Sequence, residues 1–200
     1  MSPTNDTIIR EALISKLNTA HAHDSKVRII PELGVQHGSA RVDVAVVNGV
    51  LHGYEIKSDR DTLLRLPEQV IAYNSVFDEM TLVVGKSHLY DAIHIVPDWW
   101  SILIAKTDEK NSVFFHTLRE GSKNPERNRP AVARLLWKEE ALSVLEGRGE
   151  AIGMRSKARG DIYEKLSSVL SPEVLGEVVR EILFFRQDWR PGAPLVLNGD

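Results

Sequence analysis

Two short apolar runs separated by a turn constrain the fold of this chain more than any other feature. The run RVDVAVV at residues 41–47 is rich in β-branched side chains, and LHGYEIKS at residues 51–58 has the pattern of a second strand. Both therefore favour β-strands. Asn48 and Gly49 between them tolerate positive φ angles and mark a tight turn. The stretch predicts a β-hairpin.

The length of the hairpin loop decides where the charged side chains lie. With a two-residue loop, Asp43 and Glu55 would lie on opposite faces of the strand pair. With a three-residue loop, residues 48–50, and a bulge, Asp43 would pair with Glu55 and Arg41 with Lys57. All four side chains would then share one face. Because Asp43 stands within a nearly continuous apolar run, its carboxylate needs a reason to be there. We therefore predict the three-residue loop.

Such a pair of carboxylates predicts a cation. Two carboxylates about 5 Å apart across a strand pair repel each other and need a positive charge to share. Mg²⁺ or Mn²⁺ would bind oxygen ligands of this kind, together with a phosphate of a substrate. Lys57 would orient a metal-bound water or stabilise developing negative charge. Asp43, Glu55 and Lys57 together predict phosphodiester hydrolysis.

These three residues resemble the signature of the PD-(D/E)XK, or restriction-endonuclease-like, nuclease superfamily. Its members carry an Asp on one strand and Glu-x-Lys on the next, although Val42 stands here where the family name implies Pro. Gln69 and Tyr73 resemble the QxxxY element of the RecB-type and lambda-exonuclease-type branch. Their i, i+4 spacing puts both on one face of a helix. The stretch at residues 31–85 is similar to small bacterial members of the superfamily.

The resemblance implies an α/β fold with a restriction-endonuclease-like core, in which helices flank a mixed central sheet. This core would take residues 1–118, and a helical extension would follow at 119–200. The implied function is that of a metal-dependent deoxyribonuclease in genome defence, repair or a mobile element. The implied metal ligands are Glu32, Asp43 and Glu55, with Glu11 as the alternative upstream acid, and the implied catalytic residues are Asp43, Glu55, Lys57, Gln69 and Tyr73.

Two alternatives stay open at this point. One is a nucleic-acid-binding module without turnover, and the other is a nuclease subunit that is active only within a complex, docked through its C-terminal helices. Ten Lys and Arg stand against six Glu between Arg119 and Arg159, where they would contact DNA phosphates. The candidate nucleic-acid contacts are Arg41, Arg129, Arg155, Lys157 and Arg159.

Composition narrows the class of protein further. A chain of 200 residues with 42% hydrophobic residues can bury a sizeable core. It has no cysteine and no continuous apolar segment long enough for a membrane span, and its start is unlike a signal peptide, so we expect a cytoplasmic location. The formal charge of −3 means that any DNA-binding surface is local. A homodimer would suit cleavage of both strands of a duplex.

The remaining elements follow from periodicity and helix signals. Thr4 or Asn5 would cap a first helix, and Pro67 would start or kink a helix within residues 61–77. The helix at 61–77 would connect the strand at 51–57 to a parallel strand at 80–84. Further strands are predicted at 26–30, 99–106 and 112–118, and further helices at 132–146, 158–170 and 172–187.

Overall fold

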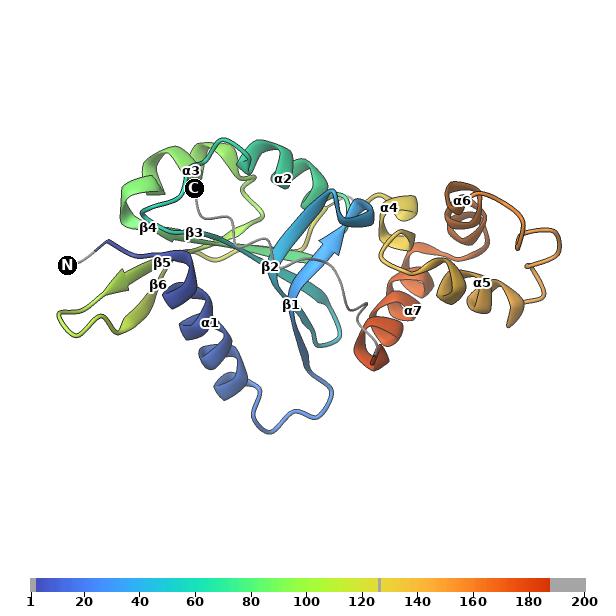
Figure 1. The fold of residues 1–200 in the computed structure, drawn as a ribbon, viewed down its shortest axis with the longest axis horizontal. Coiled ribbons are helices and arrows are strands. Elements are labelled where there is room, and N and C mark those ends of the chain that lie inside the picture. Colours follow the sequence, from blue (N-terminus) through green and yellow to red (C-terminus); the bar gives the residue numbers. More distant parts are fainter. Residues whose placement is uncertain (1–2, 126, 188–200) are drawn as a thin grey trace.

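The computed structural model of the protein describes residues 3–125 and 127–187, which form an α/β fold around one six-stranded sheet (Figure 1). The sheet order follows the sequence, from β1 to β6. Strands β3, β4 and β5 are parallel to one another, and all other neighbouring pairs are antiparallel, so the predicted mixed sheet is confirmed. The strands are β1 (Arg28–Val35), β2 (Ala40–Val47), β3 (Leu51–Lys57), β4 (Glu79–Gly85), β5 (Ser101–Thr107) and β6 (Val113–Arg119).

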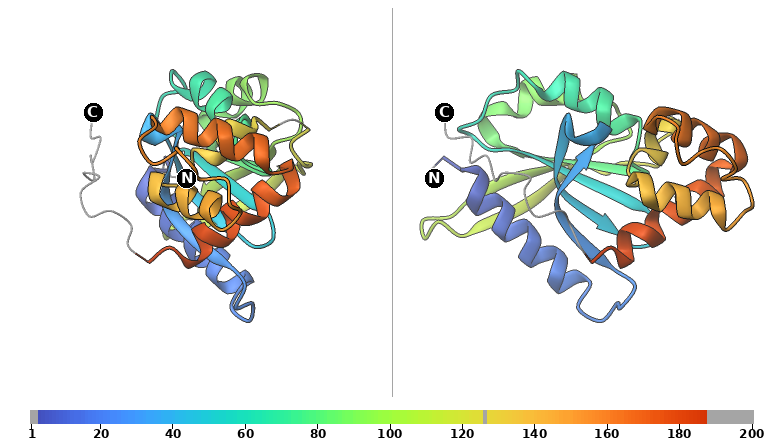
Figure 2. Two further views of the ribbon diagram at one scale, coloured as in Figure 1. Left: turned by 90° about the vertical axis from the view of Figure 1, so that its right-hand side faces the viewer. Right: turned by 45° about the vertical axis from the view of Figure 1, so that its right-hand side comes forward.

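Helices cover both faces of the sheet and one of its ends. Figure 2 shows α1 on one face, α2 and α3 on the other, and the four C-terminal helices grouped beside the β1–β2 end. The helices are α1 (Asp6–Ala20), α2 (Leu66–Asn74), α3 (Leu89–Ile95), α4 (Arg129–Ala133), α5 (Lys138–Glu146), α6 (Arg159–Val169) and α7 (Pro172–Phe185). None of the helices in the described ranges is both long enough and apolar enough to cross a membrane.

The predicted three-residue hairpin loop is confirmed. The backbone N–H of Asn48 donates to the carbonyl oxygen of Val50 at 3.1 Å, and Gly49 takes a φ of 91° that favours glycine. Val47 therefore pairs with Leu51, as the sequence predicts.

The strand ladder stops before it reaches the charged residues. Pairing between β2 and β3 ends at Val44 and Tyr54, so the expected backbone pairs further along the ladder are not made. Instead, the carboxylate of Asp43 inserts where the ladder would continue, and its Oδ2 accepts a hydrogen bond from the N–H of Ile56 at 2.6 Å. The predicted pairing of Asp43 with Glu55, and of Arg41 with Lys57, is therefore wrong, because a side chain replaces the backbone contact.

A bend in β1 and β2 lies at the same level of the sheet. Glu32 has a φ of 56°, and the Glu32–Asp43 position is missing from an otherwise continuous β1–β2 register. Ile30 and Leu33 are three residues apart, yet both enter the same hydrophobic cluster. A regular strand would place them on opposite faces. The left-handed residue therefore switches the face that β1 presents.

Local signals predicted some helix boundaries and missed others. Asn5 caps α1 by accepting a hydrogen bond from Ile8 N at 3.1 Å, and Pro67 lies in the first turn of α2, so both predictions are confirmed. The short helix α3 was not predicted. The predicted helix at 132–146 is wrong as one segment, because the chain forms α4 and α5 instead.

The break between α4 and α5 depends on a buried arginine. Glu140 accepts the N–H of Trp137 at 2.6 Å, which caps the start of α5. Arg186, which follows α7, holds the same carboxylate at 2.5 Å and lies over the Trp137 ring, 4.4 Å from its centroid. It also donates to the carbonyl of Leu135. Contacts with the end of α7 therefore stabilise the non-helical junction.

The C-terminal helices share a hydrophobic core with the sheet. One cluster runs from Ile30 and Tyr73 on the sheet side to Leu142, Tyr163 and Leu183 in the helices. The second, smaller cluster lies between α1 and the other face of the sheet. The domain boundary at residue 118 stays a prediction.

Candidate functional site

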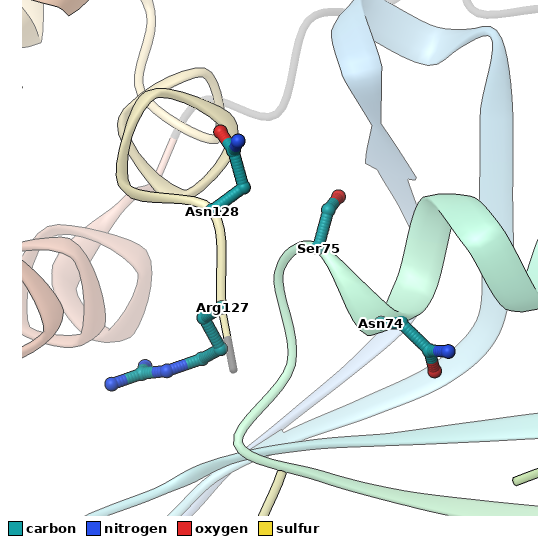
Figure 3. Close-up of a pocket in the computed structure, with 4 residues that line it drawn as sticks. All are labelled: Asn74, Ser75, Arg127 and Asn128. Atoms are coloured by element: carbon teal, nitrogen blue, oxygen red, sulfur yellow. The ribbon is translucent and has the colours of Figure 1, made fainter. Parts of the chain in front are cut away.

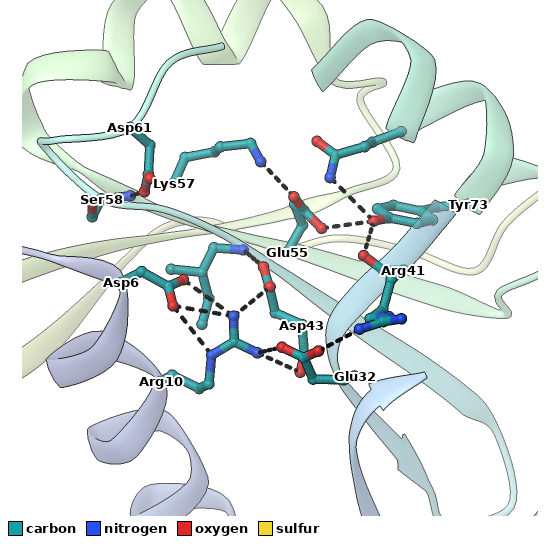
Figure 4. A network of polar contacts seen from close by, with 12 residues as sticks. Asp6, Arg10, Glu32, Arg41, Asp43, Glu55, Lys57, Ser58, Asp61 and Tyr73 are labelled. Carbon is teal, nitrogen blue, oxygen red and sulfur yellow. Dashed lines mark hydrogen bonds and ion pairs between the residues drawn. The ribbon is translucent and has the colours of Figure 1, made fainter. Parts of the chain in front are cut away.

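The residues predicted to hold a metal gather where β2 and β3 diverge, as Figure 4 shows. Their carboxylate oxygens face other protein side chains and do not surround a position for an ion. Arg10 of α1 points into the group from the α1 face, while Tyr73 of α2 enters it from the opposite face. Two linked polar clusters result, one around Arg10 and one around Glu55.

Arg10 joins three carboxylates in the first cluster. Its guanidinium lies 2.7 Å from Asp43 Oδ1, 2.9 Å from Glu32 Oε1 and 3.1 Å from Asp6 Oδ2. It also donates to the backbone carbonyl oxygen of Asp43 at 3.2 Å. The second oxygen of Glu32 is taken by Arg41 at 2.9 Å. Arg10 thus ties the first turns of α1 to the bend in β1 and β2.

The second cluster is built on Glu55, which is only 1% exposed. Lys57 Nζ lies 2.5 Å from Glu55 Oε1, and the two side chains share a face of β3, as their spacing predicts. Tyr73 Oη lies 2.9 Å from Glu55 Oε2 and 2.6 Å from the carbonyl oxygen of Arg41. Gln69 donates to the same hydroxyl at 3.3 Å. The predicted grouping of these four side chains is therefore present.

Burial and like charge shift two pKa values at this site. Burial, and then the negative charge of Glu55, raises the pKa of Asp43 above its ordinary value, against the opposing effects of Arg10 and the Ile56 N–H. Burial and the same Glu55 charge raise the pKa of the Tyr73 hydroxyl, which therefore stays protonated and can donate a hydrogen bond. The fold brings Asp43 and Glu55 close enough to interact electrostatically.

The arrangement does not fit a metal centre. Every carboxylate oxygen of Glu32, Asp43 and Glu55 already accepts a donor from the protein. Among residues 3–125 and 127–187, no group of three or more His, Cys, Asp or Glu side chains is placed to hold a metal ion. Arg10 and Lys57 supply the positive charge that the carboxylates need. The Mg²⁺ or Mn²⁺ cofactor stays a prediction.

Sequence reasoning missed Arg10, which is the centre of the first cluster. The available signal was its i, i+4 spacing from Asp6 in the first turns of a helix. That spacing indicates a surface ion pair and does not indicate contacts with β1 and β2. Glu11, the alternative upstream acid, is exposed on α1.

The predicted nucleic-acid contacts divide into two groups. Arg41 is paired with Glu32, and Arg129 donates to the carbonyl oxygens of Ser167 and Leu170 at the end of α6. These two arginines therefore have structural partners. Arg155, Lys157 and Arg159 are exposed and close together in the sequence, in the segment before and at the start of α6, and Arg155 forms an ion pair with Glu146 of α5.

A separate hollow lies between α2 and the start of α4. It has a volume of about 300 Å³ and is lined by Asn74, Ser75, Arg127 and Asn128, as Figure 3 shows. Arg127 is held by Asp78 at 2.5 Å, and the Asn128 side chain caps α4 by accepting from Ala131 N at 2.9 Å. The hollow shares no lining residue with the charged clusters.

A comparison with known proteins finds a relative in a bacteriophage. The chain is 30% identical to protein cII of Enterobacteria phage P4 over 155 residues, which are 78% of this chain. The matched part is 58% of the relative, so the chain spans little more than half the length of that protein. No solved structure matches the chain, and a restriction-endonuclease-like core is therefore not confirmed.

The family comparison covers nearly the whole chain. The model of the family described as bacteriophage P4 protein cII matches residues 2–189. Both comparisons thus point away from the restriction-endonuclease-like superfamily, and the predicted membership of it is wrong. The prediction of a metal-dependent deoxyribonuclease, which depended on that resemblance, is wrong for the same reason. The chain belongs to the bacteriophage P4 protein cII family.

Proposed function

We propose that the protein binds DNA without cleaving it, through a basic segment formed by residues 147–159. The observation that carries the proposal is the exposure of all four basic side chains in this segment, which lies between α5 and the start of α6. They are Arg148, Arg155, Lys157 and Arg159, and Glu150 is the one acid among them. Exposed cations on one short segment would contact backbone phosphates and give salt-dependent affinity.

Backbone contacts hold the basic segment in place. Lys138 Nζ on α5 donates to the carbonyl oxygens of Arg155 and Lys157, at 3.1 and 3.3 Å. Ala151 and Met154 pack against the main hydrophobic cluster. A segment that is ordered before it meets DNA loses less conformational entropy on binding than a flexible one.

The basic segment also contains one highly exposed apolar side chain. Ile152 is 94% exposed, and Gly149 and Gly153 on either side have φ angles of 72° and 74°. These left-handed glycines bend the chain around the isoleucine. Proteins that bind the minor groove use Arg and Lys there and frequently insert apolar side chains between base steps. Ile152 would make contacts of this kind.

The position of the segment suits a large ligand. In Figure 1 it lies at the outer end of the C-terminal helices, away from the sheet. The protein carries a formal charge of −3, so the basic segment must attract DNA locally against the rest of the surface. A DNA ligand is consistent with the cytoplasmic location expected from the sequence. A protein partner that docks on the C-terminal helices stays a second proposal.

Charge reversal tests the proposed function. The Lys157→Glu/Arg159→Glu variant is compared with Lys16→Glu/Lys26→Glu, which changes the net charge equally at exposed positions elsewhere. Fluorescence anisotropy with labelled duplex and single-stranded DNA, at several salt concentrations and in EDTA, gives the affinity and its salt dependence. Only the first variant should lose affinity, by about tenfold or more, with the salt slope reduced by about 2.

Two results would overturn the proposed function. In one, the wild type does not bind either form of DNA at low salt. In the other, both double variants lose affinity equally, which would mean that net charge and not the basic segment governs binding. Gel analysis of the same samples would show whether the DNA stays intact.

A further inference from the structure

The exposed isoleucine of the basic segment lies at the corner of a tight turn. Ile152 and Gly153 are the two central residues of this β-turn, in which the backbone N–H of Met154 donates to the carbonyl oxygen of Ala151 at 2.9 Å. Gly153 has a φ of 74°, while the φ of Ile152 is not positive, and this combination is that of a type II turn. At this corner the Ile152 side chain is 94% exposed.

Contacts on both sides of the corner hold the turn in place. Ala151 and Met154, which flank the two central residues, pack against the main hydrophobic cluster. The carboxylate of Glu150, which precedes the turn, lies 2.6 Å from the Nζ atom of Lys165 on α6. Ile152 is therefore an apolar side chain presented on an anchored support.

The charges around the turn favour an anionic ligand. The acids nearest in sequence are already paired, Glu150 with Lys165 and Glu146 with Arg155. The side chains of three further cations of the segment are exposed, namely Arg148, Lys157 and Arg159. The segment thus presents one apolar side chain among positive charges.

The composition of the segment favours duplex DNA over a single strand. Residues 147–159 contain no aromatic side chain on which unpaired bases could stack, and no Asn or Gln to read base edges. A lone exposed isoleucine also offers little apolar area for binding to a lipid surface. An apolar side chain beside Arg and Lys is, however, what minor-groove proteins insert between two base pairs.

We propose that Ile152 enters the base stack of duplex DNA from the minor groove and kinks the duplex, so that the protein selects DNA by its deformability. The inference rests on the proposed function, because the basic segment must bind the DNA first. Insertions of this kind unstack one base step and bend the duplex by about 20–90°. Pyrimidine–purine steps unstack easily, whereas A-tracts are stiff. The expected ligand is therefore a duplex with a flexible step.

The bend can be measured by Förster transfer between dyes at the two ends of a duplex of about 30 base pairs, at saturating protein. The wild type should raise the transfer efficiency. Ile152→Ala should keep the salt slope of binding, because no charge changes, but should leave the duplex straight, and Ile152→Leu should restore the bend. The matched control is Ile71→Ala, at an apolar side chain on α2 that is 71% exposed, which should bend DNA as the wild type does. Circular dichroism checks that each variant is folded.

A mismatched duplex tests the selection of deformable DNA. A central mismatch makes a base step easier to unstack, so the wild type should bind this duplex about fivefold or more tighter than the matched one. Ile152→Ala should bind both duplexes equally. Fluorescence anisotropy at one salt concentration gives the ratio of the two affinities.

Three results would contradict the inference and leave DNA binding by the basic segment in place. They are binding of the wild type without a bend, a bend that Ile152→Ala retains, and tighter binding to single-stranded DNA than to the duplex. Vesicles of phosphatidylglycerol supply a fourth. If Ile152→Ala loses vesicle binding and still bends DNA, the isoleucine serves a lipid surface and the inference is wrong. A wild type that binds no DNA would remove the proposed function and this inference together.

Discussion

The Nη2 atom of Arg10 on α1 lies 2.7 Å from Oδ1 of Asp43 on β2, across 33 positions of sequence. Asp43 sits where the β2–β3 ladder ends, and Arg10 supplies the charge that a buried carboxylate needs there. The contact also fixes α1 against the bend in β1 and β2. The carboxylates that the sequence predicts as metal ligands therefore belong to an internal ion-pair network in the fold.

Removal of Arg10 should destabilise the protein. Arg10→Met removes the cation that pairs with Asp43 and with one oxygen of Glu32, while both carboxylates stay partly buried. We therefore expect the unfolding free energy to fall by about 2–4 kcal/mol. Urea unfolding at neutral pH measures it. The matched control is Arg65→Met, at an exposed position, which should change the stability by less than about 0.5 kcal/mol. Equal effects of the two variants would contradict a structural role for Arg10.

Divalent ions should affect the melting temperatures of the wild type and of Arg10→Met differently. Because Arg10 already holds the carboxylates, neither Mg²⁺ nor Mn²⁺ should raise the melting temperature of the wild type, and EDTA should not lower it. Arg10→Met frees Glu32 and Asp43, so its melting temperature should rise with added Mn²⁺. Differential scanning calorimetry gives both values. A rise in the wild type would show that a metal displaces Arg10.

The Tyr73 hydroxyl should contribute to stability because it bridges two elements. Tyr73→Phe removes the donor that Glu55 and the Arg41 carbonyl share, at 2.9 and 2.6 Å, within a buried site. We expect a loss of about 1–3 kcal/mol in chemical denaturation. Tyr90→Phe, at a side chain that is 75% exposed, should have no measurable effect. No loss in Tyr73→Phe would mean that the remaining groups find other partners.

Acid should destabilise the fold through His52. Burial lowers the pKa of His52 from 6.5 to about 4, while Thr81 and Tyr54 contact its ring nitrogens. As the pH falls, the His52 side chain takes up a proton in the unfolded chain before it does so in the folded protein. The contribution of the buried His52 to the unfolding free energy is therefore fully present above pH 6.5 and is lost as the pH falls toward 4. Between these pH values, the wild type should lose up to about 3 kcal/mol more than His52→Gln.

A matched histidine variant completes this test. His23 is exposed, so His23→Gln should follow the wild-type dependence of unfolding free energy on pH. If His52→Gln loses as much stability as the wild type between neutral pH and pH 4, the buried imidazole is not the group that responds to acid.

Substitution by alanine should change the stability of the protein in opposite directions at two glycines. A Cβ at Gly85 would lie 2.5 Å from Asp59 Oδ1 and 2.7 Å from Asp59 N, so Gly85→Ala should lose more than about 1 kcal/mol. A Cβ at Gly160 would meet nothing within 4 Å in the first turn of α6, and Gly160→Ala should gain about 0.5–1 kcal/mol. Thermal unfolding distinguishes the two. A gain at both positions would mean that Asp59 moves away freely.

The close approach at Gly85 belongs to a small anchoring network. Asp59 accepts hydrogen bonds from Thr4 and Ser87, and although burial opposes them, these bonds lower the pKa of Asp59 to about 2. Asp59 thereby joins the segment just before α1 to the short 3-10 helix, Lys86–His88, that follows β4. Displacement of this carboxylate by an alanine at Gly85 would loosen both contacts.

The elements whose signals are local could be predicted from the amino-acid sequence alone. The β-branched run at 41–47 predicted β2, and the run at 51–58 predicted β3. Asn48 and Gly49 predicted the turn, and Pro67 predicted the first turn of α2. The i, i+2 and i, i+4 spacings were enough to group Glu55 with Lys57, and Gln69 with Tyr73. These features depend on backbone preferences and on residues within one or two turns of each other.

The partners of the grouped charged side chains depend on how distant segments pack. Arg10 reaches Glu32 and Asp43 because α1 packs on the sheet, and the break before α5 exists because Arg186 returns to Glu140 from the end of α7. The sequence-based prediction of a metal ion did not include these contacts between distant segments. A group of carboxylates in the sequence predicts that a positive charge is needed nearby. The packing of distant segments determines whether an arginine supplies that charge.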